Sequence, residues 1–69
     1  MDIKKTFGEK LKKLRLEKGL SQETLALKAD LDRTYLPSIE KGERNVSITV
    51  IEKLAKALNI SIKDFFDEN

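Results

Sequence analysis

Apolar residues along the chain recur every three or four positions, which is the spacing of one face of an α-helix. The first such pattern predicts a helix over about residues 3–18, with an apolar face formed by Ile3, Phe7, Leu11 and Leu14. Gly19 follows and can adopt the left-handed conformation that ends many helices. Strict alternation of apolar and polar residues is sustained nowhere, so the pattern predicts an all-α fold.

Two shorter helices follow, and capping residues mark their ends. Ser21 is an N-cap residue for a helix over about residues 22–29, because its hydroxyl group can accept a hydrogen bond from a free N–H group of the first turn. Asp32 is placed in the same way before a helix over about residues 33–41, and Gly42 ends that helix. A tight connection joins the two helices, so they form a helix-turn-helix unit from about Ser21 to Gly42.

The C-terminal part of the sequence predicts two more helices. Ser47 precedes an apolar pattern over about residues 48–58, and Asn59 can take the left-handed position after it. Ser61, with Asp64 three residues later, matches a capping box for a last short helix. We therefore expect a compact bundle of five helices.

The composition argues against catalysis and against a membrane segment. The chain has no His and no Cys, so it lacks the commonest general base, the usual thiol nucleophile and the usual zinc ligands. Its three glycines are isolated and form no phosphate-cradling loop. No apolar run approaches the roughly 20 residues of a membrane span, and the lack of Cys fits a reducing cytoplasm. We expect one cytoplasmic domain over residues 1–69 that is not an enzyme and holds no metal, cofactor or small-molecule ligand.

Charged side chains are unevenly distributed along the sequence. Lys and Arg outnumber Asp and Glu over residues 1–20, whereas the tail after Ile60 is mainly acidic, and the net charge is +2. This asymmetry indicates one face suited to a polyanion. Ordinary solvated helix faces explain the charges about as well when the charges are considered alone.

The predicted helix after Asp32 carries side chains suited to DNA. An α-helix fits the major groove, and its N-terminal residues reach the base edges. The planar fork of Arg33 matches the O6 and N7 acceptors of guanine, and Thr34 can offer a hydroxyl group, or a methyl group to thymine. Ser38 lies one turn further on the same face, and Gln22 begins the preceding helix. Arg33 alone is as well explained as a solvated surface residue, but the whole cluster favours a DNA-binding module.

Several runs of the sequence, in order, resemble the lambda-repressor-like, Xre-type helix-turn-helix family. They are LSQETLA over residues 20–26, LDRTY over 31–35 and IEKGERN over 39–45, and LAKAL over 54–58 resembles the fourth helix of that family. The resemblance covers nearly the whole chain. Within the family, the chain is most similar to controller proteins of restriction–modification systems, because of its small size and its sequence motifs DRTY and ERN.

This resemblance implies a five-helix domain that regulates transcription by binding palindromic operator DNA as a homodimer. By family position, Gln22 would contact a phosphate group and orient its neighbours, and Tyr35 would contact a phosphate group or fill space beside a bent duplex. The residues that would face bases are Arg33, Thr34 and Ser38. The residues that would contact the DNA backbone or the edge of the adjacent groove are Lys41, Arg44 and Asn45.

Glu40 follows Ile39 on the inner side of its predicted helix, where a carboxylate group needs a partner. Arg15, near the end of the first helix, is the matching cation in the family that the sequence resembles. A bidentate arginine–carboxylate pair suits a partly buried position. Two separate surface charges remain the alternative.

Pro37 interrupts the pattern of the same helix. Proline has no N–H group to donate, and its ring crowds the carbonyl group four residues earlier, so a proline in mid-helix costs about 3 kcal/mol. Because Pro37 is the fifth residue after Asp32, only the first normal hydrogen bond of the helix is at risk. We expect a bent or tightened first turn with Pro37 facing outward.

Self-association is expected because a monomer of this size touches few base pairs. The candidate interface is the predicted fourth helix with the loop after it, through Ile48, Thr49, Glu52, Asn59 and Ile60. A restriction–modification controller is the preferred interpretation, and a phage-type repressor or an antitoxin remains open. The alternative from another class is a helical protein-interaction module that uses Ile60, Ile62, Phe65 and Phe66.

Overall fold

The computed structural model describes residues 2–67, which form four α-helices and one short 3₁₀-helix and contain no strand. The elements are α1 (Ile3–Glu17), α2 (Gln22–Lys28), α3 (Tyr35–Glu40), α4 (Ile48–Leu58) and the 3₁₀-helix η1 (Ile62–Phe65). The predicted all-α fold is confirmed, although the fifth predicted helix is a single 3₁₀ turn. No helix in this part of the chain is long and apolar enough to cross a membrane.

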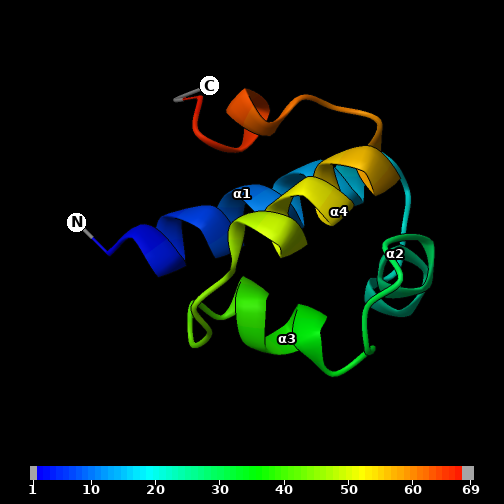
Figure 1. Cartoon of the computed structure of the whole chain (residues 1–69), viewed down its shortest axis with the longest axis horizontal. Helices are drawn as coiled ribbons and strands as arrows, with labels where there is room; N and C mark the ends of the chain where they lie inside the picture. Colours follow the sequence, from blue (N-terminus) through cyan, green and yellow to red (C-terminus); the bar gives the residue numbers. More distant parts are fainter. Residues whose placement is uncertain (1, 68–69) are drawn as a thin grey trace.

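The long helix α1 organises the molecule. α3 packs against α1, and η1 packs against both α1 and α4 on the opposite side (Figure 1). The short helix α2 lies at one end of the molecule, where it contacts α3 and α4. This arrangement leaves α3 and the loop after it along one edge, and the C-terminal segment lies on the other.

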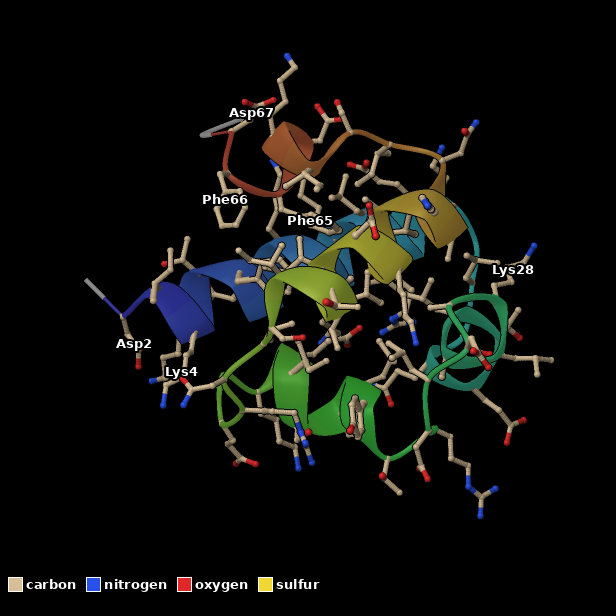
Figure 2. The ribbon with its side chains drawn as sticks, in the orientation of Figure 1. Asp2, Lys4, Lys28, Phe65, Phe66 and Asp67 are labelled. Carbon is tan, nitrogen blue, oxygen red and sulfur yellow. The ribbon has the colours of Figure 1, made fainter. Side chains whose placement is uncertain are left out.

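Apolar side chains from every helix meet in one buried cluster. Its members are Phe7, Leu11, Leu25, Ala26, Ala29, Leu36, Ile39, Leu54, Ala55, Leu58 and Phe65. Figure 2 shows Phe65 beneath η1, and its ring centroid lies 4.9 Å from that of Phe7. Ile3, by contrast, is 57% exposed, because the first turn of α1 extends beyond the core. The predicted apolar face of α1 is therefore correct from Phe7 onward and wrong at Ile3.

The four α-helices end in the same way. In each, a residue in the left-handed conformation follows the last turn, and the next N–H group donates back to a carbonyl group five residues earlier. The left-handed residues are Gly19, Asp30, Gly42 and Asn59. The returning bonds are Leu20 to Arg15, Leu31 to Ala26, Glu43 to Ser38 and Ile60 to Ala55. Because these ends are tight, the helices are joined by connections of a few residues.

Helix α3 begins later than the sequence predicts. The side chain of Asp32 accepts hydrogen bonds from the N–H group of Thr34 at 2.9 Å and from its hydroxyl group at 2.8 Å. These bonds close a local turn, so that regular helix starts at Tyr35 rather than at Arg33. The prediction that Asp32 caps a helix over residues 33–41 is therefore wrong.

The later start explains how α3 accommodates Pro37. Pro37 is the third residue of α3, and N–H groups in the first turn have no partner within the helix. The missing donor therefore costs no helical hydrogen bond. The turn before it is tightened, with the N–H group of Tyr35 donating to the carbonyl oxygen of Asp32 at 3.0 Å. The ring is partly buried rather than fully outward, because it lines a shallow pocket with Lys12 and Lys41.

Candidate nucleic-acid interface

A buried ion pair fixes the helix-turn-helix unit to α1. Nε of Arg15 donates to Oε2 of Glu40 at 2.7 Å, and Nη2 donates to Oε1 at 3.0 Å. The two side chains are 9% and 4% exposed. The hydrogen bond to Glu40 raises the pKa of Arg15 against the opposing effect of burial. Nη1 of Arg15 also donates to the carbonyl oxygen of Leu20 at 2.7 Å, so one guanidinium group ties α1 to α3 and to the loop before α2.

Gln22 joins this cluster from the first position of α2. Its Nε2 donates to Oε1 of Glu40 at 3.1 Å, so the carboxylate group accepts from both Arg15 and Gln22. One of the two side-chain N–H groups of Gln22 therefore binds Glu40, while Gln22 itself is only partly buried. The predicted phosphate contact of Gln22 and its predicted role in orienting neighbours both remain predictions.

The start of α3 presents the side chains that were expected to face bases. Arg33 and Thr34 are both exposed. Nη1 of Arg33 lies 3.5 Å from Oε2 of Glu23 on α2, and both side chains are about three-quarters exposed, at 76% and 75%. Such an exposed pair is weak, so the guanidinium group can leave it at little cost. The hydroxyl group of Thr34 donates to Asp32, which leaves its methyl group and its acceptor lone pairs available.

The turn at the start of α3 also carries a fixed negative charge. Hydrogen bonds from the backbone N–H group and then from the hydroxyl group of Thr34 hold the pKa of Asp32 below its ordinary value. The positive charges of Arg33 and Arg44 act in the same direction. Asp32 is fully exposed, so it moderates the positive potential at this end of α3.

Arg44, in the loop after α3, folds back onto that helix. Its guanidinium carbon lies 4.3 Å from the centre of the Tyr35 ring, and its Nε donates to Oγ of Ser38 at 3.0 Å. Ser38 in turn donates to the carbonyl oxygen of Tyr35 at 2.9 Å. The structure thus brings together three residues that the sequence placed in separate roles. No spacing in the sequence indicates this cluster.

The remaining candidates lie around the same edge or on α4. Lys41 and Asn45 are exposed at the end of α3 and in the loop after it. Of the dimer candidates, Ile48, Thr49, Glu52 and Asn59 are exposed, whereas Ile60 packs partly against the core. Ile48 is 81% exposed, the highest exposed fraction among the large apolar side chains of the described residues. Sequence reasoning missed Glu23 as the partner of Arg33, because this contact joins two helices through their tertiary arrangement.

Comparison with known proteins identifies the family. Residues 11–65 match the helix-turn-helix family. The chain is 54% identical over 68 residues to the control protein C.MunI of Mycoplasma sp., a match that covers 97% of this chain and 92% of that protein. It belongs to the restriction–modification controller proteins. The control protein C.BamHI of Bacillus amyloliquefaciens is 49% identical over 67 residues, with 96% of this chain and 83% of that protein covered.

Solved structures of controller proteins share the fold. The controller protein C.AhdI of Aeromonas hydrophila superimposes with a TM-score of 0.88 at 52% identity, covering 90% of this chain and 94% of that one. The controller protein C.Esp1396I, solved as a tetramer with its natural 35-base-pair operator, has a TM-score of 0.82 at 45% identity and covers 90% and 82% of the two chains. The predicted Xre-type family and controller subfamily are thus confirmed. The family consists of transcriptional regulators.

Proposed function

We propose that this controller protein regulates transcription of a restriction–modification system in the cytoplasm, by binding a two-fold symmetric operator as a homodimer. The observation that carries the proposal is the exposed Arg33–Thr34 pair at the start of a helix that is braced from behind by the buried Arg15–Glu40 pair. Sequence-specific readout needs base-facing groups held by a rigid support, and this edge of the molecule supplies both.

Base readout would depend mainly on Arg33. Its guanidinium group can form two parallel hydrogen bonds with O6 and N7 of guanine, while the methyl group of Thr34 can contact thymine. The exchange of the weak contact with Glu23 for two bonds to a base favours the correct sequence. A duplex without guanine at that position would leave Arg33 with its original partner. Discrimination of about 1–3 kcal/mol for each such contact is typical.

Affinity would come mainly from charged and polar groups around α3. Lys41, Arg44 and Asn45 lie at its C-terminal end, and Tyr35 and Gln22 flank it. Lys41 and Arg44 are exposed cations that can contact phosphate groups, and each phosphate neutralised releases counterions and adds to the salt dependence of binding. Specificity and affinity would therefore depend on different residues of one surface.

A homodimer would double the bases that are read. We assign its interface to α4 and the residues after it, through Ile48, Thr49, Glu52, Asn59 and Ile60. The exposed side chain of Ile48 supports this choice, because burial against a symmetry-related copy would remove it from water. The related protein C.Esp1396I is a tetramer on its operator, so oligomers on DNA occur among the relatives.

The direct test is selection of bound duplexes from a random pool, followed by binding measurements on the selected and a scrambled sequence at two salt concentrations. We expect a palindromic consensus, and affinity for it about 10³-fold or more above that for the scrambled duplex. Affinity for both duplexes should fall as salt rises. If no sequence is enriched and binding to duplexes is insensitive to salt, the proposal fails and the surface around Phe66 and Ile62 becomes the better candidate for function.

A further inference from the structure

The loop that follows α3 is attached to that helix by the side chain of Arg44. The guanidinium carbon of Arg44 lies over the Tyr35 ring, and Nε donates to Ser38. Arginine side chains on exposed loops are usually mobile, and binding must then order them at an entropic cost. Here two contacts of different kinds already hold this exposed side chain in one orientation.

The hydroxyl group of Ser38 is occupied by this arrangement. A serine hydroxyl group has one hydrogen to donate, and Ser38 directs it to the carbonyl oxygen of Tyr35 at 2.9 Å. One lone pair accepts from Nε of Arg44. Ser38 is also only partly exposed. It is therefore better placed to orient Arg44 than to read a base itself.

The held orientation leaves one edge of the arginine available. No residue among those described accepts a hydrogen bond from Nη1 or Nη2 of Arg44. The charge of Arg44 also acts on Asp32, so the guanidinium group lies near the start of α3, where Thr34 is exposed. Its free edge presents two parallel donors, which match two oxygens of a phosphate group.

We propose that Ser38 and Tyr35 are positioning residues that hold Arg44 for a bidentate contact with one DNA phosphate group beside the groove that α3 enters. This inference rests on the proposed function, since it assigns roles within the same interface. Because the orientation of Arg44 is fixed, its contact with the phosphate group forms only when α3 lies correctly in the groove. Arg44 therefore adds to the preference for the operator over other DNA, beyond the contribution of its charge.

The test is a double-mutant cycle with Ser38→Ala, Arg44→Ala and the double variant, measured on the operator and on a scrambled duplex. Ser38→Ala should weaken operator binding about 3- to 10-fold, through loss of the Nε acceptor, and change binding to the scrambled duplex by less than about 2-fold. In the Arg44→Ala background, Ser38→Ala should have no further effect on operator binding. If Ser38→Ala weakens operator binding equally in both backgrounds, Ser38 contacts DNA directly and the inference is wrong.

Variants that keep part of the arrangement separate position from charge. Arg44→Lys keeps the positive charge but loses the planar face and the Nε donor, so it should weaken operator binding, though less than Arg44→Ala, and leave binding to the scrambled duplex nearly unchanged. Tyr35→Phe keeps the ring beside Arg44 and should retain the coupling between Ser38 and Arg44, whereas Tyr35→Leu removes the ring and should resemble Ser38→Ala. Full operator affinity in Arg44→Lys would overturn the inference. Unfolding midpoints of all variants identify any that fail to fold.

The two proposals fail in different ways. If the wild-type protein binds no duplex in a salt-dependent manner, the proposed function is wrong. If the wild type selects an operator but the cycle shows independent effects of Ser38 and Arg44, only the positioning role is wrong.

Discussion

Gly8 of α1 lies against the backbone of α3 at Ile39. A Cβ atom placed on Gly8 would lie 2.3 Å from the carbonyl oxygen of Ile39 and 2.9 Å from that of Glu40. Both are backbone atoms of the helix that carries the candidate DNA-binding residues. The glycine therefore allows α1 and α3 to approach closely, and this approach brings Glu40 within reach of Arg15.

Gly8→Ala should destabilise the protein even though alanine is the better helix former. The gain in helix propensity is about 1 kcal/mol, but separating two packed backbones costs about 1–3 kcal/mol or more. We expect a net loss of up to about 2 kcal/mol in the free energy of unfolding, measured by urea denaturation. Lys13→Ala, an exposed position on the same helix, is the control and should change stability by less than about 0.5 kcal/mol. A more stable Gly8→Ala variant would show that the helices separate easily.

Removing either member of the Arg15–Glu40 pair should also lower stability. Each variant leaves one largely buried charge without its partner, and such losses reach about 3 kcal/mol or more. Arg15→Ala should have the larger effect, since it also frees the carbonyl oxygen of Leu20, while Gln22→Ala should cost only about 1 kcal/mol. Melting midpoints equal to that of the wild type for both Arg15→Ala and Glu40→Ala would contradict this account.

The turn before α3 should respond to acid through Asp32. Hydrogen bonds from Thr34 place the folded pKa of this carboxyl group below its ordinary value of 3.8. A group with a lowered folded pKa contributes stability above its unfolded pKa and loses that contribution as the pH falls through its folded pKa. The stability difference between the wild type and Asp32→Asn should therefore be constant at neutral pH and shrink below pH 3.8.

Urea unfolding at several pH values checks this expectation. Thr34→Val removes the hydroxyl donor but keeps the backbone N–H group. The stability difference between Thr34→Val and the double variant Thr34→Val/Asp32→Asn should therefore depend less on pH than the difference between the wild type and Asp32→Asn. If the stability difference between the wild type and Asp32→Asn stays the same down to about pH 2, folding does not favour the ionised form of Asp32.

Much of this fold could be predicted from the sequence because its signals are local. The 3.6-residue spacing of apolar side chains located α1, α2 and α4 to within a residue, and the caps at Ser21 and Ser47 are as expected. The capping box between Ser61 and Asp64 is also present. The start of α3 could not be predicted in this way, because Asp32 can either cap a helix or close a turn over two residues, and both use the same side chain.

The details of the candidate site depend on packing between elements. The contacts of Arg44 with Tyr35 and of Arg33 with Glu23 join residues whose separation in the sequence follows no helical or turn pattern. They form because α3 packs against α2 and because the loop after α3 folds back onto that helix. The residue types at the candidate DNA-binding edge were therefore predictable, whereas the contacts that these residues make with one another were not.

Self-association should depend on Ile48. An aspartate there would place a charge in the proposed apolar interface, and burial of an unpaired charge opposes association. Ile48→Asp should sediment as a monomer at concentrations where the wild type is a dimer. Leu27→Asp is a matched control, because Leu27 is 80% exposed, close to the 81% of Ile48, but lies on α2. If both variants remain dimeric, or if only Leu27→Asp dissociates, the interface lies elsewhere.

Arg33 and Lys41 should differ in how they contribute to DNA binding. Arg33→Ala should cost about 1–3 kcal/mol on the operator and relax base preference at one position in each half-site, because a base contact is lost. Lys41→Ala should weaken binding to all sequences alike and reduce the salt slope by about one for each lost phosphate contact.

Glu23→Gln tests the role of Arg33 further, since it frees Arg33 from its partner without removing the guanidinium group. It should raise affinity for the operator more than for scrambled DNA, because Arg33 gives up Glu23 only when it binds guanine and keeps this partner on a duplex without guanine. Salt titrations of the three variants on both duplexes provide the comparison. If Arg33→Ala weakens both duplexes equally, Arg33 contacts the backbone, and base readout must be assigned to other residues of α3.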